Sequence, residues 1–228
     1  MSERAASRRD VSIPASGLLL RGDLHLPKTP AGLAVFVHSS GTTRRDPQNE
    51  LVARRLERHG VGTLLVDLLQ DYEARERHNV FDVELQAQRL IEVVRWLRAE
   101  PGCAALPLGY FGTGVGAGVA LIAAARAPEL VSAVVSRGGR PDTAREALQH
   151  VKAPTLFIAD ESGAAPDWID AAFRACAGEK ELAVVPSPSR LYKEPEALEA
   201  VAQHAERWFA RHLTHVKASS GEGRTMAP

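Results

Sequence analysis

LPLGYFGTGVGAGVALIAAA, residues 106–125, changes from a strand pattern to a helix pattern within a few positions. Leu106–Phe111 is a short apolar run, which is typical of a strand buried in a parallel sheet. Val115–Ala125 is apolar and rich in alanine, which favours a buried helix. Glycines 112 and 114 lie between the two, Gly116 follows Val115, and together they permit a sharp turn. The stretch therefore predicts a strand, a tight turn and a helix, the repeating unit of an α/β fold.

The rest of the chain repeats this alternation of strands and helices. Val11–Ile13 and Leu18–Leu24 flank Pro14–Gly17 and predict an antiparallel hairpin at a sheet edge. Further strands are expected at 33–37, 63–66, 131–135, 155–158 and 181–185, and helices at 49–59, 83–97, 143–148, 168–177 and 198–209. We therefore expect a mostly parallel, twisted sheet of about eight strands, with the hairpin at its edge and helices on both faces.

The composition is that of one ordinary globular domain. The 228 residues carry 28 basic and 28 acidic side chains, and 45% of them are hydrophobic. This balance of charge argues against nucleic acid or an anionic membrane surface as a partner. No apolar run reaches about 18 residues, so no membrane helix is expected. We expect a single domain over 11–213, with disordered tails at 1–10 and 214–228, where small and polar residues dominate.

The amino terminus and the two cysteines bear on cellular location and on metal or cofactor binding. Met1–Asp10 is charged and lacks the apolar segment of a signal peptide. Cys103 and Cys176 match no metal or redox spacing, and we interpret both as inert thiols in a reducing compartment. We therefore expect a cytoplasmic protein with no metal and no cofactor. The sequence gives no indication of oligomeric state.

Functional residues are expected in the loops that follow the strands, because ligands of open α/β sheets bind beyond the carboxyl ends of the strands. Four loops matter most: 38–45, 111–116, 159–163 and 186–191. The second has glycine at both flanks between a strand and a helix, which is the setting of a nucleophile elbow. Its middle position is Gly114, which has no hydroxyl group.

Six ordered motifs between about Val11 and Leu213 carry a family resemblance. They are VFVHSSG (35–41), LLVDLL (64–69), GYFG (109–112), VVSRGGRPD (134–142), APTL (153–156) and EPEALE (194–199). On these motifs the chain resembles the dienelactone-hydrolase-like branch of the α/β-hydrolases, including hydrolase domains fused to phosphoribosyltransferase domains. The resemblance implies an α/β-hydrolase fold and a family activity of carboxylic-ester hydrolysis through a serine, an acid and a histidine.

The resemblance also implies that all three catalytic positions are changed in this chain. The family's serine falls on Gly114, its acid near Gly163 and its histidine on Arg190, while its oxyanion loop corresponds to His38–Gly41. Loss of the serine or the histidine of such a triad costs about a millionfold in turnover. We therefore expect no serine-hydrolase activity, and the sequence leaves open whether the protein is an enzyme at all.

Several residues remain as candidates for the pocket: His38, Ser39, Ser40, Thr113, Val115, Arg137, Asp160, Glu161 and Arg190. His38 fits a loop-shaping role better than a general acid or base, because the sequence names no partner for it. The three hydroxyl residues are candidate displaced nucleophiles without an evident base. Asp160 and Glu161 are near enough to the lost acid position to replace it, but a solvated loop role is the simpler interpretation.

Two further patterns have competing interpretations. Arg137 and Arg190 both follow strands and together would make an anion site, although a surface or salt-bridged role is the default for Arg137. Gly112–Ala117 also fits the G-x-G-x-x-A dinucleotide pattern. Because a hairpin and two β–α units precede it, we prefer close strand–helix packing as the explanation.

These observations lead to three hypotheses. The first is a non-hydrolytic binding or regulatory protein whose former active-site pocket takes a small anionic ligand or a protein partner. The second is an enzyme of lyase, isomerase or cyclase type that uses His38, Asp160 or Glu161 for proton transfer. The third is a weak ester hydrolase with a relocated nucleophile. All three assume that no hydroxyl, imidazole and carboxylate meet at the mouth of the sheet.

Overall fold

The structure is a computed structural model that describes residues 6–38, 41–160, 167–186 and 194–213. Its eight strands form one sheet in the order β1-β2-β4-β3-β5-β6-β7-β8. The strands are β1 (Ser7–Ala15), β2 (Leu18–Leu26), β3 (Gly32–Val37), β4 (Val61–Val66), β5 (Leu108–Thr113), β6 (Ala133–Arg137), β7 (Thr155–Asp160) and β8 (Lys180–Val185). β1 and β2 pair antiparallel, β2 pairs antiparallel with β4, and the other neighbours are parallel. The predicted sheet and its edge hairpin are confirmed.

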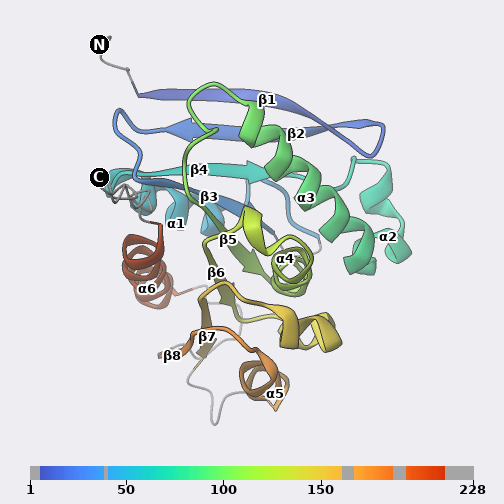
Figure 1. The fold of residues 1–228 in the computed structure, drawn as a ribbon, viewed down its shortest axis with the longest axis vertical. Helices are drawn as coiled ribbons and strands as arrows, with labels where there is room; N and C mark the ends of the chain where they lie inside the picture. Colours follow the sequence, from blue (N-terminus) through green and yellow to red (C-terminus); the bar gives the residue numbers. More distant parts are fainter. Residues whose placement is uncertain (1–5, 39–40, 161–166, 187–193, 214–228) are drawn as a thin grey trace, which may run out of the picture.

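Helices cover both faces of the sheet, as expected. The α-helices are α1 (Pro47–Arg58), α2 (Arg77–Phe81), α3 (Val83–Ala99), α4 (Val115–Arg126), α5 (Asp167–Ala175) and α6 (Pro195–His212). Figure 1 shows α1 and α6 on one face and α3, α4 and α5 on the other, and a separate apolar core lies under each set. Three short 3₁₀ segments, η1 (Glu73–Arg75), η2 (Pro128–Leu130) and η3 (Pro141–His150), complete the described part. The sequence patterns predicted η3 as a short helix but missed α2, η1 and η2.

The first strand begins earlier in the chain than the sequence predicted. Disorder was expected over 1–10, but β1 begins at Ser7 and its first four residues pair with 23–26 of β2. Their side chains are exposed, so backbone hydrogen bonds to β2 hold them, together with ion pairs from Arg8 to Glu57 and from Arg9 to Glu100. The prediction was wrong for residues 7–10. Residues 1–5 and the predicted carboxyl-terminal tail lie outside the described residues.

Both cysteines are buried and free. Cys176 follows the last residue of α5 instead of lying within the helix, because the helix ends two residues earlier than predicted. Burial raises the pKa of the Cys176 thiol, although hydrogen bonds involving Thr155 and Gly178 oppose the shift. A higher thiol pKa leaves less thiolate at neutral pH, which agrees with the inert role expected for this residue.

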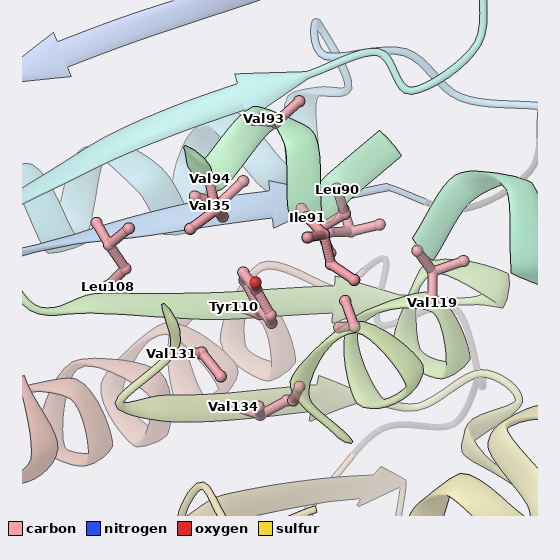
Figure 2. Packing of buried hydrophobic residues seen from close by; sticks show 14 of the residues in the cluster. Val35, Leu90, Ile91, Val93, Val94, Leu108, Tyr110, Val119, Val131 and Val134 are labelled. Carbon is pink, nitrogen blue, oxygen red and sulfur yellow. The ribbon is translucent and has the colours of Figure 1, made fainter. Parts of the chain in front are cut away.

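The apolar strand and helix of residues 106–125 form the centre of the fold. β5 is buried along its whole length, and ten of the twelve residues of α4 are buried. In Figure 2, Tyr110 of β5 lies among aliphatic side chains, including Val35 of β3 and Ile91 of α3. None of the helices in the described ranges has both the length and the apolar character that crossing a membrane requires.

Tyr110 is fully buried, and its hydroxyl group has no hydrogen-bond partner among the described residues. A buried polar group without a partner is destabilising by about 1–3 kcal/mol. We expect Tyr110→Phe to raise the free energy of unfolding by about 1 kcal/mol in urea denaturation. Tyr110→Ala, which removes the ring, should lower it by about 3–5 kcal/mol. A loss of stability above about 1 kcal/mol in the phenylalanine variant would contradict the unpartnered hydroxyl.

Candidate functional site

The turn between β5 and α4 lies at the carboxyl edge of the sheet and has the shape of an elbow. Gly114 occupies its tip with φ 57° and ψ −126°, in the left-handed region that side-chain-bearing residues rarely adopt. The backbone N–H of Arg140 donates to the carbonyl oxygen of Gly114 at 3.1 Å. The predicted strand–turn–helix unit is confirmed, with a glycine where an elbow holds its nucleophile.

The flanking glycines allow neighbouring backbones to approach this turn. A Cβ at Gly116 would lie 2.3 Å from the carbonyl oxygen of Val37, and a Cβ at Gly112 would lie 2.6 Å from that of Gly116. A Cβ at Gly139, in the loop after β6, would lie 2.5 Å from the Cα of Gly114. Close packing of the turn therefore accounts for these glycines, as the sequence interpretation proposed.

His38 lies directly after β3, and its side chain contacts that of Asp67, which directly follows β4. Its Nε2 is 3.1 Å from Oδ1 of Asp67, and both side chains are more than four-fifths buried. The parallel register sets this distance, because Val37 of β3 pairs with Val66 of β4. The sequence named no partner for His38, and the structure supplies one in Asp67. The expectation that no hydroxyl, imidazole and carboxylate meet together at this edge stays untested, because Ser39 and Ser40 lie outside the described residues.

Arg44 fixes the position of the Asp67 carboxylate. Its backbone N–H donates to Oδ1 at 2.7 Å and its Nη1 donates to Oδ2 at 2.6 Å. Its Nε donates to Oδ1 of Asp23, on β2, at 3.2 Å. Arg44 thereby links the edge hairpin to the acid that contacts His38.

The pKa of Asp67 reflects two opposing effects. Burial raises it, but hydrogen bonds from His38 and Arg44 favour the charged form and bring the pKa below its ordinary value. Asp23 behaves in the opposite way: burial raises its pKa, the cross-strand neighbour Asp10 adds to the increase, and Arg44 opposes it. Asp67 is therefore the anchored carboxylate of this group.

A small cavity lies beside the His38–Asp67 pair. Its volume is about 50 Å³. It lies between loop 41–43, the end of β4, the segment around η1 and α2, and Gln86 of α3. The polar residues that line it are His38, Thr42, Thr43, Asp67, Asp71 and Gln86.

Three other predicted residues line the same edge of the sheet. Arg137 ends β6 and is 8% exposed, and the register places it beside Thr113, the last residue of β5, which is 3% exposed. Nη2 of Arg137 donates to Oε1 of Gln48 in α1 at 3.1 Å. Asp160 ends β7 and is also buried. Their burial contradicts the solvated role given to Asp160 and the surface alternative given to Arg137.

Val115 begins α4 next to Gly114 and is 8% exposed. The remaining predicted positions, Glu161, Gly163 and Arg190, lie outside the described residues together with Ser39 and Ser40. The anion site predicted from Arg137 and Arg190 is therefore untested. Over the described ranges, no group of three or more His, Cys, Asp and Glu side chains is arranged to hold a metal ion.

Asp67, Arg44 and Gln48 were missed in the sequence. Asp67 carried a usable signal, since it directly follows a predicted strand, as His38 does. That signal becomes specific only when β4 is known to neighbour β3 in parallel. Arg44 and Gln48 belong to loop and helix positions whose contacts depend on the three-dimensional arrangement alone.

Gly116→Ala tests the packing of the elbow. The added methyl group would meet two backbone oxygens, those of Val37 and His38, which have little freedom to move. We expect the free energy of unfolding to fall by about 1–3 kcal/mol, as in other overpacked interiors. Thermal or urea unfolding measures this change, and an unchanged stability would show that the turn is looser than the structure indicates.

Asp67→Asn tests the ion-pair cluster. The pKa of Asp67 in the folded protein lies below the ordinary value of 3.8, so the charged form stabilises the fold above that pH. This contribution is lost as the pH falls through the folded-state pKa. We expect the variant to be less stable than the parent by about 2 kcal/mol at pH 7. The difference should shrink below about pH 4, and a gap that stays constant from pH 7 to pH 3 would contradict the cluster.

Comparisons with known proteins agree with this architecture. A scan of protein-family models found no match. The crystal structure of a dienelactone hydrolase from Anabaena variabilis is 42% identical to this chain, with a TM-score of 0.88. The match covers 92% of this chain and 100% of that one. An esterase of Pyrococcus furiosus shares the fold at 15% identity and a TM-score of 0.74, over 91% of this chain and 94% of its own.

Curated relatives match the chain over part of their own length. Two Mycobacterium tuberculosis proteins, whose names describe them as phosphoribosyl transferases, are 46% identical over 207 residues. The match covers 90% of this chain and 46% of each relative, so the chain spans less than half of their length. The identity to a dienelactone hydrolase over that protein's whole length decides the family. This chain belongs to the dienelactone hydrolase family of the α/β-hydrolase fold.

Proposed function

We propose that this protein binds a small anionic ligand at the carboxyl edge of its sheet and forms no acyl-enzyme on its elbow. The observation that carries the proposal is Gly114 at the tip of the turn between β5 and α4. In an α/β-hydrolase this position presents the nucleophilic hydroxyl. A glycine there supplies no atom that can attack a carbonyl group, so the covalent half of the family's reaction has no starting point.

The resemblance of the sequence to the family extends this argument to the other two catalytic positions. It aligns the acid with Gly163 and the histidine with Arg190. An arginine stays protonated in proteins and cannot act as the base for a hydroxyl group. A protein with these three replacements retains the fold of a hydrolase while lacking its proton acceptor.

The charge at the edge of the sheet supports an anionic ligand. Arg137 is buried beside the elbow, and its guanidinium group has the planar donor geometry that suits carboxylate and phosphate groups. Gln48 of α1 contacts it and holds one of its donor nitrogens in place. A carboxylate or phosphate group that reached this end of β6 would suit the guanidinium group of Arg137 in charge and geometry.

A second candidate function is proton transfer to or from the bound ligand, and the His38–Asp67 pair favours it. An imidazole that contacts an anchored carboxylate is the usual construction of a general base. The pair lines a cavity at the same edge of the sheet. This candidate needs no nucleophile on the elbow.

Partner and location are also part of the proposal. The matched region is less than half of the curated relatives, so in them the hydrolase-type fold is joined to a further segment. We therefore keep a protein partner as the alternative occupant of the carboxyl edge. The free thiols of Cys103 and Cys176 support a reducing compartment, the cytoplasm.

A fluorophosphonate probe tests the proposal directly, because it labels hydroxyl groups that an adjacent base activates. We expect no adduct on the full chain by intact mass, under conditions in which an esterase such as the Pyrococcus furiosus relative is labelled stoichiometrically. Ligand binding is followed with short carboxylates and phosphates by calorimetry, with Arg137→Gln as the weakened variant and exposed Arg54→Gln as the matched control.

Stoichiometric labelling at Ser39, Ser40 or Thr113 would overturn the proposal in favour of a relocated nucleophile. Equal binding of anions by the parent and by Arg137→Gln would contradict the proposal of an anionic ligand at Arg137. It would not affect the proposal that the elbow forms no acyl-enzyme.

A further inference from the structure

Residues 69–81, which we call the strap, lie between β4 and α3 and line one side of the small cavity beside His38. The strap contains η1 and α2, and no residue of either short helix is buried. Figure 1 shows α2 at the periphery of the molecule, beside the end of α3. The strap therefore contributes little to the apolar core. Its residues that line the cavity are Leu69, Asp71, Ala74 and Val80.

Both ends of the strap are anchored independently of the segment between them. Leu68, directly before the strap, is 3% exposed and belongs to the apolar core. Asp82, directly after it, accepts a hydrogen bond from the backbone N–H of Leu85 at 2.9 Å and thereby caps α3. The first turn of α3 is therefore stabilised without the strap. These are the properties of a segment that opens locally while the sheet and its helices stay folded.

Two side chains of α3 hold the strap in place. Nε2 of Gln86 donates to the carbonyl oxygens of Asn79 and Val80, each at 3.1 Å. The guanidinium group of Arg89 donates to the Glu73 carboxylate twice, from Nη1 to Oε2 at 2.9 Å and from Nη2 to Oε1 at 2.7 Å. These hydrogen bonds lower the pKa of Glu73, so the pair is charged at neutral pH. The contact is charge-assisted and bidentate, the strong kind of polar contact.

Arg89 is held in position by more than Glu73. Its side chain is 4% exposed, and Nη1 also donates to the carbonyl oxygen of Leu68, outside the strap, at 2.8 Å. Its Nε is buried and has no hydrogen-bond partner among the described residues. Departure of Glu73 with the strap would leave a buried cation without its carboxylate, which is unfavourable unless another anion takes that place. Carboxylate and phosphate groups both have the geometry to do so.

We propose that the strap is a removable cover and that Arg89 is an oxyanion-binding residue, occupied by Glu73 as long as the cover is closed. A small carboxylate or phosphate competes with Glu73 for the guanidinium group, and its binding opens the strap. The inference goes beyond the proposed function, because Arg89 lies on α3 whereas Arg137 lies on β6. The strap thereby makes access to the cavity at the carboxyl edge depend on the concentration of a small anion.

Chemical rescue tests the competition, because propionate has the same carboxylate end as a glutamate side chain. Glu73→Ala empties the site, so about 0.1 M propionate should raise its ratio of folded to unfolded protein roughly tenfold, for a dissociation constant of about 10 mM. In the parent the tethered Glu73 carboxylate competes, and the ratio should rise about threefold or less. Urea unfolding measures both ratios. Inorganic phosphate is the second arm and distinguishes a phosphate ligand from a carboxylate ligand.

Controls separate the loss of Glu73 from a general effect of salt or charge. Propionamide, which has a similar shape without the charge, and sodium chloride at equal ionic strength should not rescue Glu73→Ala. Glu84→Ala is the matched variant, because Glu84 lies on α3 and pairs with Arg126 at the surface. Its loss leaves no buried cation behind, so propionate should stabilise this variant no more than the parent.

Hydrogen exchange of the parent measures the opening directly and decides the inference if Glu73→Ala does not fold. Amides of the strap should exchange through a local opening that is independent of low urea concentrations, whereas amides of β5 should require global unfolding. Propionate or phosphate at high concentration should speed exchange in the strap severalfold and should not speed it in β5.

Three results would overturn the inference. They are absence of rescue of Glu73→Ala by either anion, equal stabilisation of the parent and both variants, and strap amides whose exchange follows the urea dependence of β5 or is unchanged by anions. None of these bears on the proposals for the elbow and for Arg137. Those proposals fail separately, through labelling by the fluorophosphonate probe or through equal anion binding by Arg137→Gln.

Discussion

The close approach of backbones around the β5–α4 turn is the constraint on which the rest of the structure depends. A single methyl group at Gly116 would meet the carbonyl oxygen of Val37, so the first turn of α4 lies directly against the end of β3. His38 directly follows Val37. Val66 pairs with Val37 across the two parallel strands, and Asp67 directly follows Val66. The packing that makes the elbow sharp therefore also fixes the strand end that carries the imidazole. Loss of this contact would disturb both features together.

Charge burial at the same edge follows a consistent pattern. Taking a carboxylate out of water is unfavourable unless hydrogen bonds and an opposite charge compensate. Asp67 receives both from Arg44 and a further hydrogen bond from His38. Arg44 in turn contacts Asp23, so the edge hairpin is tied to the site through one guanidinium group. The hairpin contributes to the site through this contact although it lies at the far edge of the sheet from α5 (Figure 1).

Family membership rests on sequence identity and fold, not on the side chain at the tip of the elbow. The identity to a dienelactone hydrolase extends over that whole chain, and the elbow keeps the backbone conformation that a nucleophile would need. The side chain at its tip is absent. A backbone turn is maintained by packing between glycines, strands and a helix, whereas a nucleophile is maintained only by its use in catalysis. The turn thus follows from the packing of the fold, and the His38–Asp67 contact on the neighbouring strand ends is a separate feature of the same edge.

The sequence by itself determined the eight strands and the longer helices to within a few residues, because periodicity, glycine turns and apolar runs are local properties of the chain. It identified the hairpin, the strand–turn–helix unit around Gly114 and the burial of α4. Only the tertiary structure decided that β4 lies beside β3 and thereby brings Asp67 to His38, that Arg44 reaches both Asp23 and Asp67, and that Ser7–Asp10 joins the sheet. These contacts join residues that are far apart in the sequence. Their distances are set by strand order and register, which the free energy of the whole packed sheet selects and no local pattern encodes.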